Sequence, residues 1–208
     1  MSLNKSGMNR LCSQMEGLVT DLRAKRVFDS VVVICDGKTS IWKWAENAEC
    51  FEGATFILDF YHAAEHISDA AEAIFGKGSE EGGRWYGKYR ARLKEDGDGL
   101  ASLVRSLNYY GRKARRGSDR RKTIYREARY YSKNKHRMNY AEFLLRGLPI
   151  GSGPVEAACK TVVGARLKRS GMRWNRDGGQ RVLNMRVQHL SKRWNLFWNA
   201  YMGDRLAA

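Results

Sequence analysis

The stretch VVVICDGKTSIWKWAENAECFEGATFILDFYHAAEH, residues 31–66, decides the fold. Two short runs rich in β-branched residues, Val31–Cys35 and Thr55–Leu58, each end at an aspartate, and a helix-length segment separates them. This order predicts a βαβ unit, whose crossover makes the two strands parallel. Asp36 and Asp59 are then expected at the carboxyl ends of neighbouring strands, where open α/β sheets place their ligands.

The two aspartates support two interpretations. Carboxylates at one edge of a sheet suggest a site for a metal ion or a phosphate group. Alternatively, Asp36 and Gly37 form only a turn, and Asp59 only caps the helix that follows it. These residues alone leave both interpretations open.

The composition is that of a folded protein. The chain has 208 residues, of which 43% are apolar and 11% aromatic, enough for the core of one domain or of one domain with a large insertion. No segment reaches the apolar length of a membrane span, and the polar start lacks the hydrophobic run of a secretory signal. The four cysteines form no CxxC pair, so neither a disulfide framework nor a cysteine zinc site is indicated. We therefore expect a cytoplasmic protein.

The charge is unevenly distributed. Residues 1–100 contain 13 Lys and Arg against 16 Asp and Glu, whereas residues 101–208 contain 25 against six. The basic runs GRKARRGSDRRK (111–122) and ARLKRSGMRWNR (165–176) lie in this second half. Such an excess is typical of a protein that binds phosphates, although a solvated face, or a surface for anionic lipid or an acidic protein, would also produce it. We favour nucleic acid, because neither half shows a membrane-type basic amphipathic helix.

Outside the βαβ unit, the sequence predicts helices. Apolar spacing, turns and capping signals predict helices over residues 9–26, 63–75, 85–93, 100–110, 123–131, 155–163, 179–189 and 191–201. No strand pattern appears after the βαβ unit. The loop GLPIGSGP (147–154) leads into the helix that carries Glu156 in its first turn.

Glu156 has two possible roles. A site for two metal ions needs several carboxylate oxygens facing one point, and a helix packed on the sheet would bring Glu156 beside Asp36. A glutamate near a helix start is, however, more often a favourable partner for the helix dipole.

Four segments of the chain resemble a known family. They are VVVICDGKTSIWKWAE (31–46), GATFILDFYHAAEHI (53–67), NKHRMNYAEFLLRGLPIGSGPVEAACKTVVGARLKRSGMRWN (134–175) and LSKRWNLFW (190–198). Together they are similar to the carboxyl-terminal catalytic portion of DDE insertion-sequence transposases of the ISKra group, kin to the Mutator-like transposases. GSGPVEAACK followed by RLKRSGM is too long and idiosyncratic to arise from composition.

The resemblance implies a fold and an activity. The fold is expected to be α/β and predominantly helical, a truncated RNase H-like fold with a small parallel sheet and an all-helical insertion. The activity is expected to be DNA strand cleavage and transfer with two Mg²⁺ or Mn²⁺ ions. Asp36 matches the second catalytic aspartate of the family and Glu156 its catalytic glutamate, so both would be metal ligands. Asp59 and His62 match a DxxH element, in which Asp59 would support the site rather than act as a principal metal ligand.

The first catalytic aspartate of the family has no counterpart here. In the family it lies on a strand of a meander that precedes the strand ending at Asp36, whereas here only a helix does, and Asp21 and Asp29 flank the end of that helix. The family's amino-terminal DNA-binding region is also missing. We therefore expect a fragment that is inactive alone. It would be one partial catalytic domain (1–208), made of a βαβ core with its leading helix (9–66), a helical insertion (67–147), and the helix of Glu156 with basic terminal helices (148–208).

The expected partners follow from this interpretation. They are DNA, as transposon ends and target, and either a polypeptide that supplies the missing portion or further copies of this chain. No membrane is expected, and the protein would be associated with the nucleoid. The alternative function is a non-catalytic DNA-binding protein derived from a transposase, whose carboxylates only satisfy hydrogen bonds. A third function, an RNA-binding or nuclease accessory protein, leaves the carboxylate placement unexplained.

Two histidines and a set of cations complete the candidate residues. His62 and His66 are four residues apart, a spacing that suits zinc, but HAAEH is not HExxH and no third ligand is evident. We favour a hydrogen-bonding role for His62 and a place near the site for His66. The cations that follow Glu156, and would lie beside a scissile phosphate, are Lys160, Arg166, Lys168, Arg169 and Arg173. The tryptophans at 174, 194 and 198 are predicted to be core residues.

Overall fold

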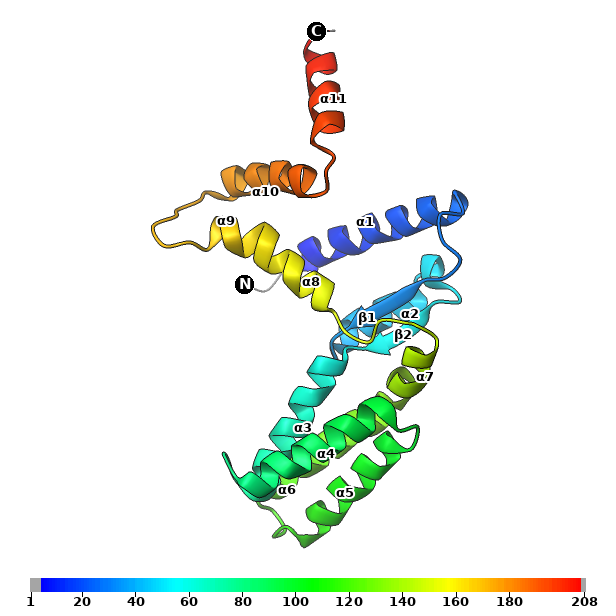
Figure 1. Ribbon diagram of the computed structural model, residues 1–208, viewed down its shortest axis with the longest axis vertical. Coiled ribbons are helices and arrows are strands. Elements are labelled where there is room, and N and C mark those ends of the chain that lie inside the picture. Colours follow the sequence, from blue (N-terminus) through cyan, green and yellow to red (C-terminus); the bar gives the residue numbers. More distant parts are fainter. Residues whose placement is uncertain (1–4, 207–208) are drawn as a thin grey trace. The chain divides into compact units, whose positions relative to one another are not determined.

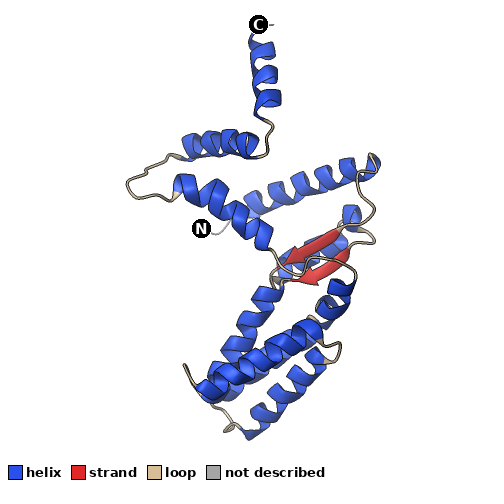
Figure 2. Ribbon diagram, viewed as in Figure 1, coloured by secondary structure: helices blue, strands red, loops and turns tan. Residues whose placement is uncertain are grey.

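The structure, a computed structural model, describes residues 5–206 and divides into two compact units, Met1–Gly151 and Ser152–Ala208. Helices predominate, as predicted (Figure 2). Unit 1 contains α1 (Lys5–Ala24), β1 (Val32–Cys35), α2 (Thr39–Asn47), β2 (Thr55–Leu58), α3 (Phe60–Phe75), α4 (Glu80–Glu95), α5 (Gly99–Lys113), α6 (Asp119–Lys133) and α7 (Tyr140–Leu145), with short 3-10 turns at Glu49–Phe51 and Lys135–Arg137. Unit 2 contains α8 (Gly153–Ala158), a π-helical turn (Cys159–Gly164), α9 (Ala165–Leu167), α10 (Arg176–Leu190) and α11 (Trp194–Leu206). None of these helices is both long and apolar enough to cross a bilayer.

The predicted βαβ unit is confirmed. β1 and β2 pair in parallel, with Cys35 opposite Leu58 at the end of the ladder, and α2 forms the crossover. The Asp59 N–H donates to the Cys35 carbonyl over 2.9 Å, which continues the pairing by one residue. Asp36 and Asp59 therefore leave the sheet at the same edge.

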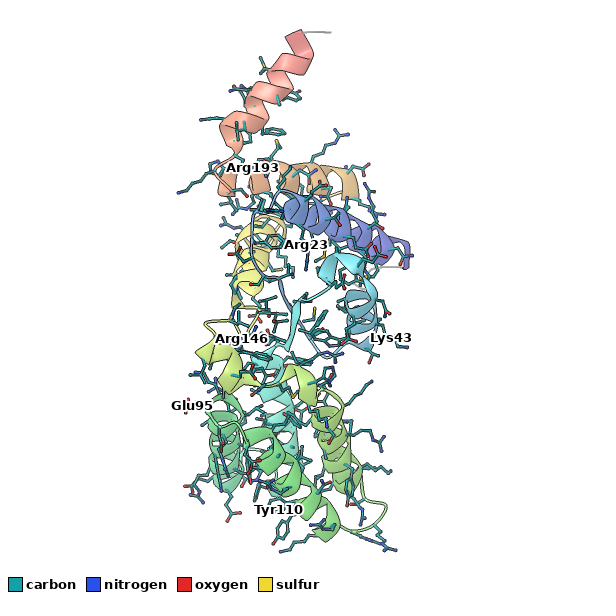
Figure 3. The ribbon with its side chains drawn as sticks, turned by 90° about the vertical axis from the view of Figure 1, so that its right-hand side faces the viewer. Arg23, Lys43, Glu95, Tyr110, Arg146 and Arg193 are labelled. Atoms are coloured by element: carbon teal, nitrogen blue, oxygen red, sulfur yellow. The ribbon has the colours of Figure 1, made fainter. Side chains whose placement is uncertain are left out.

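The two outer edges of this sheet differ. Beyond β2, the Tyr140 hydroxyl donates to the Leu58 carbonyl over 2.9 Å, and Arg146, labelled in Figure 3, reaches the Thr55 hydroxyl over 3.4 Å. Beyond β1, no other strand pairs within residues 5–206, and all four residues of β1 are only half-buried. The edge of β1 is thus the open one.

The core of unit 1 is built around α3. Its small and branched residues recur at helical spacing and are buried: Ala63, Ala64, Ile67, Ala70, Ala71 and Ile74. α4 and α6 pack against α3, and α5 packs against both of them, so α3 to α6 form a bundle beside the sheet (Figure 1). The Tyr131 hydroxyl of α6 donates to the Ala63 carbonyl over 2.6 Å and fixes α6 on α3.

Capping sets the starts of α4 and α6, which lie earlier than the apolar spacing predicts. The Ser79 hydroxyl accepts from the Gly82 N–H over 3.3 Å, so α4 begins at Glu80, ahead of the predicted start at residue 85. Ser118 likewise accepts from the Arg121 N–H over 3.3 Å at the start of α6. Both serines satisfy backbone donors that a helix end leaves unpaired.

Unit 2 has almost no core. Gly179 is the one buried residue among those of the unit whose side chains are described. The prediction that the three tryptophans are core residues is wrong: Trp174 is 38% exposed, Trp198 is 46% exposed, and Trp194 is half-buried. Trp194 instead stacks on Trp198, with ring centroids 6.0 Å apart, because they lie one turn apart on α11 and no second layer among the described residues of the unit covers them.

Candidate functional site

Asp36 ends β1 and lies at the surface. Its Oδ1 accepts a hydrogen bond from the Lys38 N–H over 3.0 Å, which turns the chain from the strand into α2. The residue between them is Gly37, where a Cβ atom would stand 2.7 Å from Cε2 of Tyr130. Only glycine fits under this ring, so the turn of Asp36 is shaped by α6 as well as by β1.

Asp59 ends β2 and is buried, with 4% of its surface exposed. Its Oδ1 accepts from the N–H groups of Tyr61, over 2.7 Å, and His62, over 3.0 Å, and so caps α3. Both local interpretations of the aspartates, a turn for Asp36 and a helix cap for Asp59, are confirmed. These two local roles are compatible with the position of both aspartates at one edge of the sheet.

Tyr130 of α6 joins this edge to the histidines of α3. Its ring stacks on His66 with a centroid distance of 3.7 Å, and its hydroxyl is buried without a hydrogen-bond partner in the described part of the chain. Burial raises the pKa of the Tyr130 hydroxyl well above its usual value, and nearby carboxylates raise it further: Asp36, Glu127, Asp59 and Glu65. The hydroxyl therefore stays protonated beside a group of negative charges.

The histidines each bind a carboxylate. Nδ1 of His62 lies 3.1 Å from Oε2 of Glu65 on the same helix, and Nδ1 of His66 lies 2.6 Å from Oε2 of Glu127 on α6. The predicted hydrogen-bonding role of His62 is confirmed. His66 stacks on Tyr130, whose ring also lies beside Gly37 at the sheet edge, and its predicted place near a catalytic site stays a prediction.

Sequence reasoning missed Glu127. Its side chain is fully buried and also accepts from Nε of Arg126 over 2.7 Å. Burial raises the pKa of Glu127, but the hydrogen bonds from His66 and Arg126 outweigh burial and leave it below the usual value. A signal was present, because Glu127 falls on the buried face of α6, three residues after Ile124 and four before Tyr131.

Glu127 belongs to a different group of possible metal ligands, which includes His66 but not His62, so the predicted zinc pair of His62 and His66 gains no third ligand. Ligand atoms of His66, Asp69 and Glu127 all lie within 4.8 Å of one another. A nitrogen and two carboxylate oxygens are donors that zinc accepts. The direct hydrogen bond between His66 and Glu127 accounts for their closeness without an ion.

Replacing Glu127 with Gln is expected to lower the free energy of unfolding by about 2 kcal/mol at neutral pH, because two charge-assisted hydrogen bonds are weakened, one from His66 across the α3–α6 contact and one from Arg126 within α6. The pKa of Glu127 is depressed in the folded state, so its contribution is complete above the unfolded pKa and is lost as pH falls through the folded pKa. Urea unfolding at neutral and acidic pH measures this difference. Glu65→Gln is the matched control, because Glu65 is 76% exposed and also pairs with a histidine, and it should cost less than about 0.5 kcal/mol. Equal stability of Glu127→Gln and wild type at neutral pH would contradict the assignment.

Glu156 lies in unit 2, in the first turn of α8, where its N–H donates to the Ser152 carbonyl over 3.0 Å. The residue is exposed. A π-helical turn, a rare element that is frequent at functional sites, starts three residues later at Cys159. Because Glu156 and Asp36 belong to different units, their predicted convergence stays a prediction.

The predicted DNA-contacting cations of unit 2 are all exposed: Lys160, Arg166, Lys168, Arg169 and Arg173. None forms an ion pair with a carboxylate of the described chain. Arg166 lies over the ring of Trp174, with 5.8 Å between the guanidinium carbon and the ring centroid. These side chains are available to an anionic partner.

Comparison of the chain with protein-family models, with curated proteins and with solved structures finds no match.

Proposed function

We propose that this chain is a catalytic portion of a DDE-type transposase, with a truncated RNase H-like fold, that acts in metal-dependent cleavage and transfer of DNA strands. The observation that carries the proposal is the exposed carboxylate of Asp36 at the carboxyl end of a parallel strand, beside Asp59 on the neighbouring strand. In open α/β sheets this edge is where ligands bind.

The residues present suit a hard cation in type. Asp36 offers carboxylate oxygen to solvent, and Glu156, on an exposed helix start, offers the same chemistry. When bound, two Mg²⁺ or Mn²⁺ ions would activate the attacking oxygen and stabilise the leaving oxygen of a phosphodiester. Asp59 holds the start of α3, and His62 and His66 extend from that helix, so these three would support the site rather than bind the metal.

The open edge of β1 is consistent with a site that lacks one strand and its aspartate. The described chain before β1 forms the helix α1, which includes Asp21, and a turn that holds Asp29, so neither aspartate lies on a strand. The missing aspartate would enter on a strand paired with β1.

One observation favours the second candidate, a non-catalytic DNA-binding protein. Both strand-end aspartates already have structural roles, Asp36 in a turn and Asp59 as a helix cap. In that case the basic side chains alone carry the function.

Localised cleavage by iron separates the two candidates. With added hydrogen peroxide and ascorbate, Fe²⁺ that replaces Mg²⁺ in a site reduces the peroxide to hydroxyl radicals that cut the nearby backbone, so we expect cuts near both Asp36 and Glu156. The cuts should disappear in an Asp36→Asn, Glu156→Gln double variant, whereas Asp29→Asn, outside the site, should retain them. With two of the three carboxylates, the chain alone should nick supercoiled plasmid no faster than the double variant. Cuts near only one of the two residues would contradict a shared site and leave the DNA-binding candidate.

A further inference from the structure

A basic groove runs along α6 in unit 1. Two adjoining hollows, of about 470 Å³ and 430 Å³, share Arg126 and Arg129 in their walls. The cations of α6 that line them, here called the α6 groove residues, are Arg121, Lys122, Arg126, Arg129 and Lys133. Lys43, which extends from α2 and is labelled in Figure 3, lines the second hollow as well.

Most of the positive charge of the groove is unneutralised. Residues 101–151 contain 14 Lys and Arg and three Asp and Glu, a larger excess than the 11 and three of residues 152–208. Among the groove residues, Lys122 pairs with Asp119 and Arg126 with Glu127, whereas Arg129 and Lys133 have no carboxylate partner in the described chain. A face that only needed solvation would not require a hollow lined by cations, so the groove favours a bound anion.

The spacing of the cations fits an extended polyanion. Arg121 and Lys133 are twelve residues apart on one helix, which corresponds to about 18 Å. This is roughly half a turn of duplex DNA. A small anion would occupy one hollow, whereas a phosphodiester backbone would occupy both.

The groove leads to the sheet edge. Its second hollow is lined by Gly37 and Tyr130, and Gly37 follows Asp36 directly. A strand held by Arg129 and Lys133 would therefore pass beside the carboxylate of Asp36.

We propose that the α6 groove binds the phosphate backbone of duplex DNA and directs one strand to Asp36. This inference deepens the proposed function and rests on it for the role of Asp36. The binding itself requires only the described contacts of unit 1. It names individual residues of α6 as DNA contacts, whereas the sequence analysis gave only the basic run 111–122 for the helical region and named single cations only after Glu156.

A charge-matched pair of variants of the full chain tests the groove. The first variant is Lys122→Gln, Arg129→Gln, Lys133→Gln, at three exposed positions of the groove. The control is Lys77→Gln, Lys88→Gln, Lys94→Gln, which removes the same charge from α4 and the loop before it. By fluorescence anisotropy with a duplex, the groove variant should bind at least about tenfold more weakly at 0.1 M salt, and the salt slope should fall by about three. The control should change affinity less than about twofold, and both should keep the wild-type melting temperature.

The outcomes are separable from those of the iron experiment. If the groove variant binds DNA as tightly as its control, the proposal that the α6 groove binds DNA is contradicted, whatever the result of the iron experiment. A weakened groove variant without iron cuts at Asp36 and Glu156 supports the groove and contradicts the metal chemistry. Protection of the backbone near Arg129 from freely diffusing hydroxyl radicals by added duplex supports the groove, and unchanged cutting there overturns it.

Discussion

Raising the salt concentration from 50 to 200 mM is expected to lower the affinity of the full chain for a DNA duplex by about 10³-fold or more. Each neutralised phosphate releases a counterion, and about six contacts are enough for this loss. The chain offers more than that number, because residues 152–208 contain 11 Lys and Arg and the α6 groove adds five. Anisotropy titrations at several salt concentrations measure the slope.

The same titration with duplexes of unrelated sequence is the control. Phosphate contacts carry no sequence information, so the affinities should agree within a few fold at each salt concentration. An affinity that barely changes between 50 and 200 mM salt would show that the basic residues do not bind phosphates, and would contradict both the transposase and the DNA-binding candidates. The measurement needs the full chain, because a cut at residue 101, where the charge changes, would fall within α5 and break the α3–α6 bundle.

The sheet and most helices could be predicted because their signals are local. The runs Val31–Cys35 and Thr55–Leu58 carry β-branched residues and end at aspartates, so strand, direction and edge follow from the chain itself. The presence of most helices was also predictable. The starts of α4 and α6 were not, because Ser79 and Ser118 cap these helices at positions that apolar spacing does not mark.

The site could be predicted only in part because two of its contacts join residues far apart in sequence. Glu127 lies 61 residues from His66, and Tyr130 lies still farther from Gly37, so neither contact leaves a local pattern. Both contacts depend on which face of α6 is buried. The spacing of Glu127 from Ile124 and Tyr131 indicates its burial but not its partner His66, which only the packing of α6 on α3 supplies.

The prediction that the tryptophans of unit 2 are core residues was wrong for a related reason. Residue type and spacing predict burial only where a second layer exists to cover the apolar face. Trp194 and Trp198 have helical spacing, but the described part of unit 2 supplies no such layer, and the two rings cover each other. The resemblance could not supply this information, since it concerned motifs and not packing.

Replacing Gly99 with Ala is expected to lower the free energy of unfolding of unit 1 by about 3 kcal/mol or more. A Cβ atom on Gly99 would stand 1.9 Å from the Arg92 carbonyl oxygen, which is backbone and cannot rotate away. The turn between α4 and α5 would have to open, at the cost of the hydrogen bond from the Gly99 N–H to the Asp96 carbonyl, 2.9 Å long. The melting temperature should fall by about 6–12 °C, measured by circular dichroism.

Gly97→Ala, in the same turn, is the matched control. No atom lies within 4 Å of a Cβ at Gly97, so this change should leave stability within about 1 kcal/mol of wild type. A Gly99→Ala melting temperature equal to that of Gly97→Ala would contradict the close approach of α4 and α5.

The Gly99→Ala variant also connects the bundle with DNA binding. α5 packs on α6, so thermal unfolding of the Gly99→Ala variant removes the support of the α6 groove without changing any of its cations. Below its melting temperature the variant should bind duplex DNA like wild type. Above that temperature, and below the wild-type melting temperature, its affinity should fall to that of the Lys122→Gln, Arg129→Gln, Lys133→Gln variant, because the basic residues of unit 2 remain in both. Wild-type affinity of unfolded Gly99→Ala would mean that the cations of α6 act as a charged chain and not as a groove.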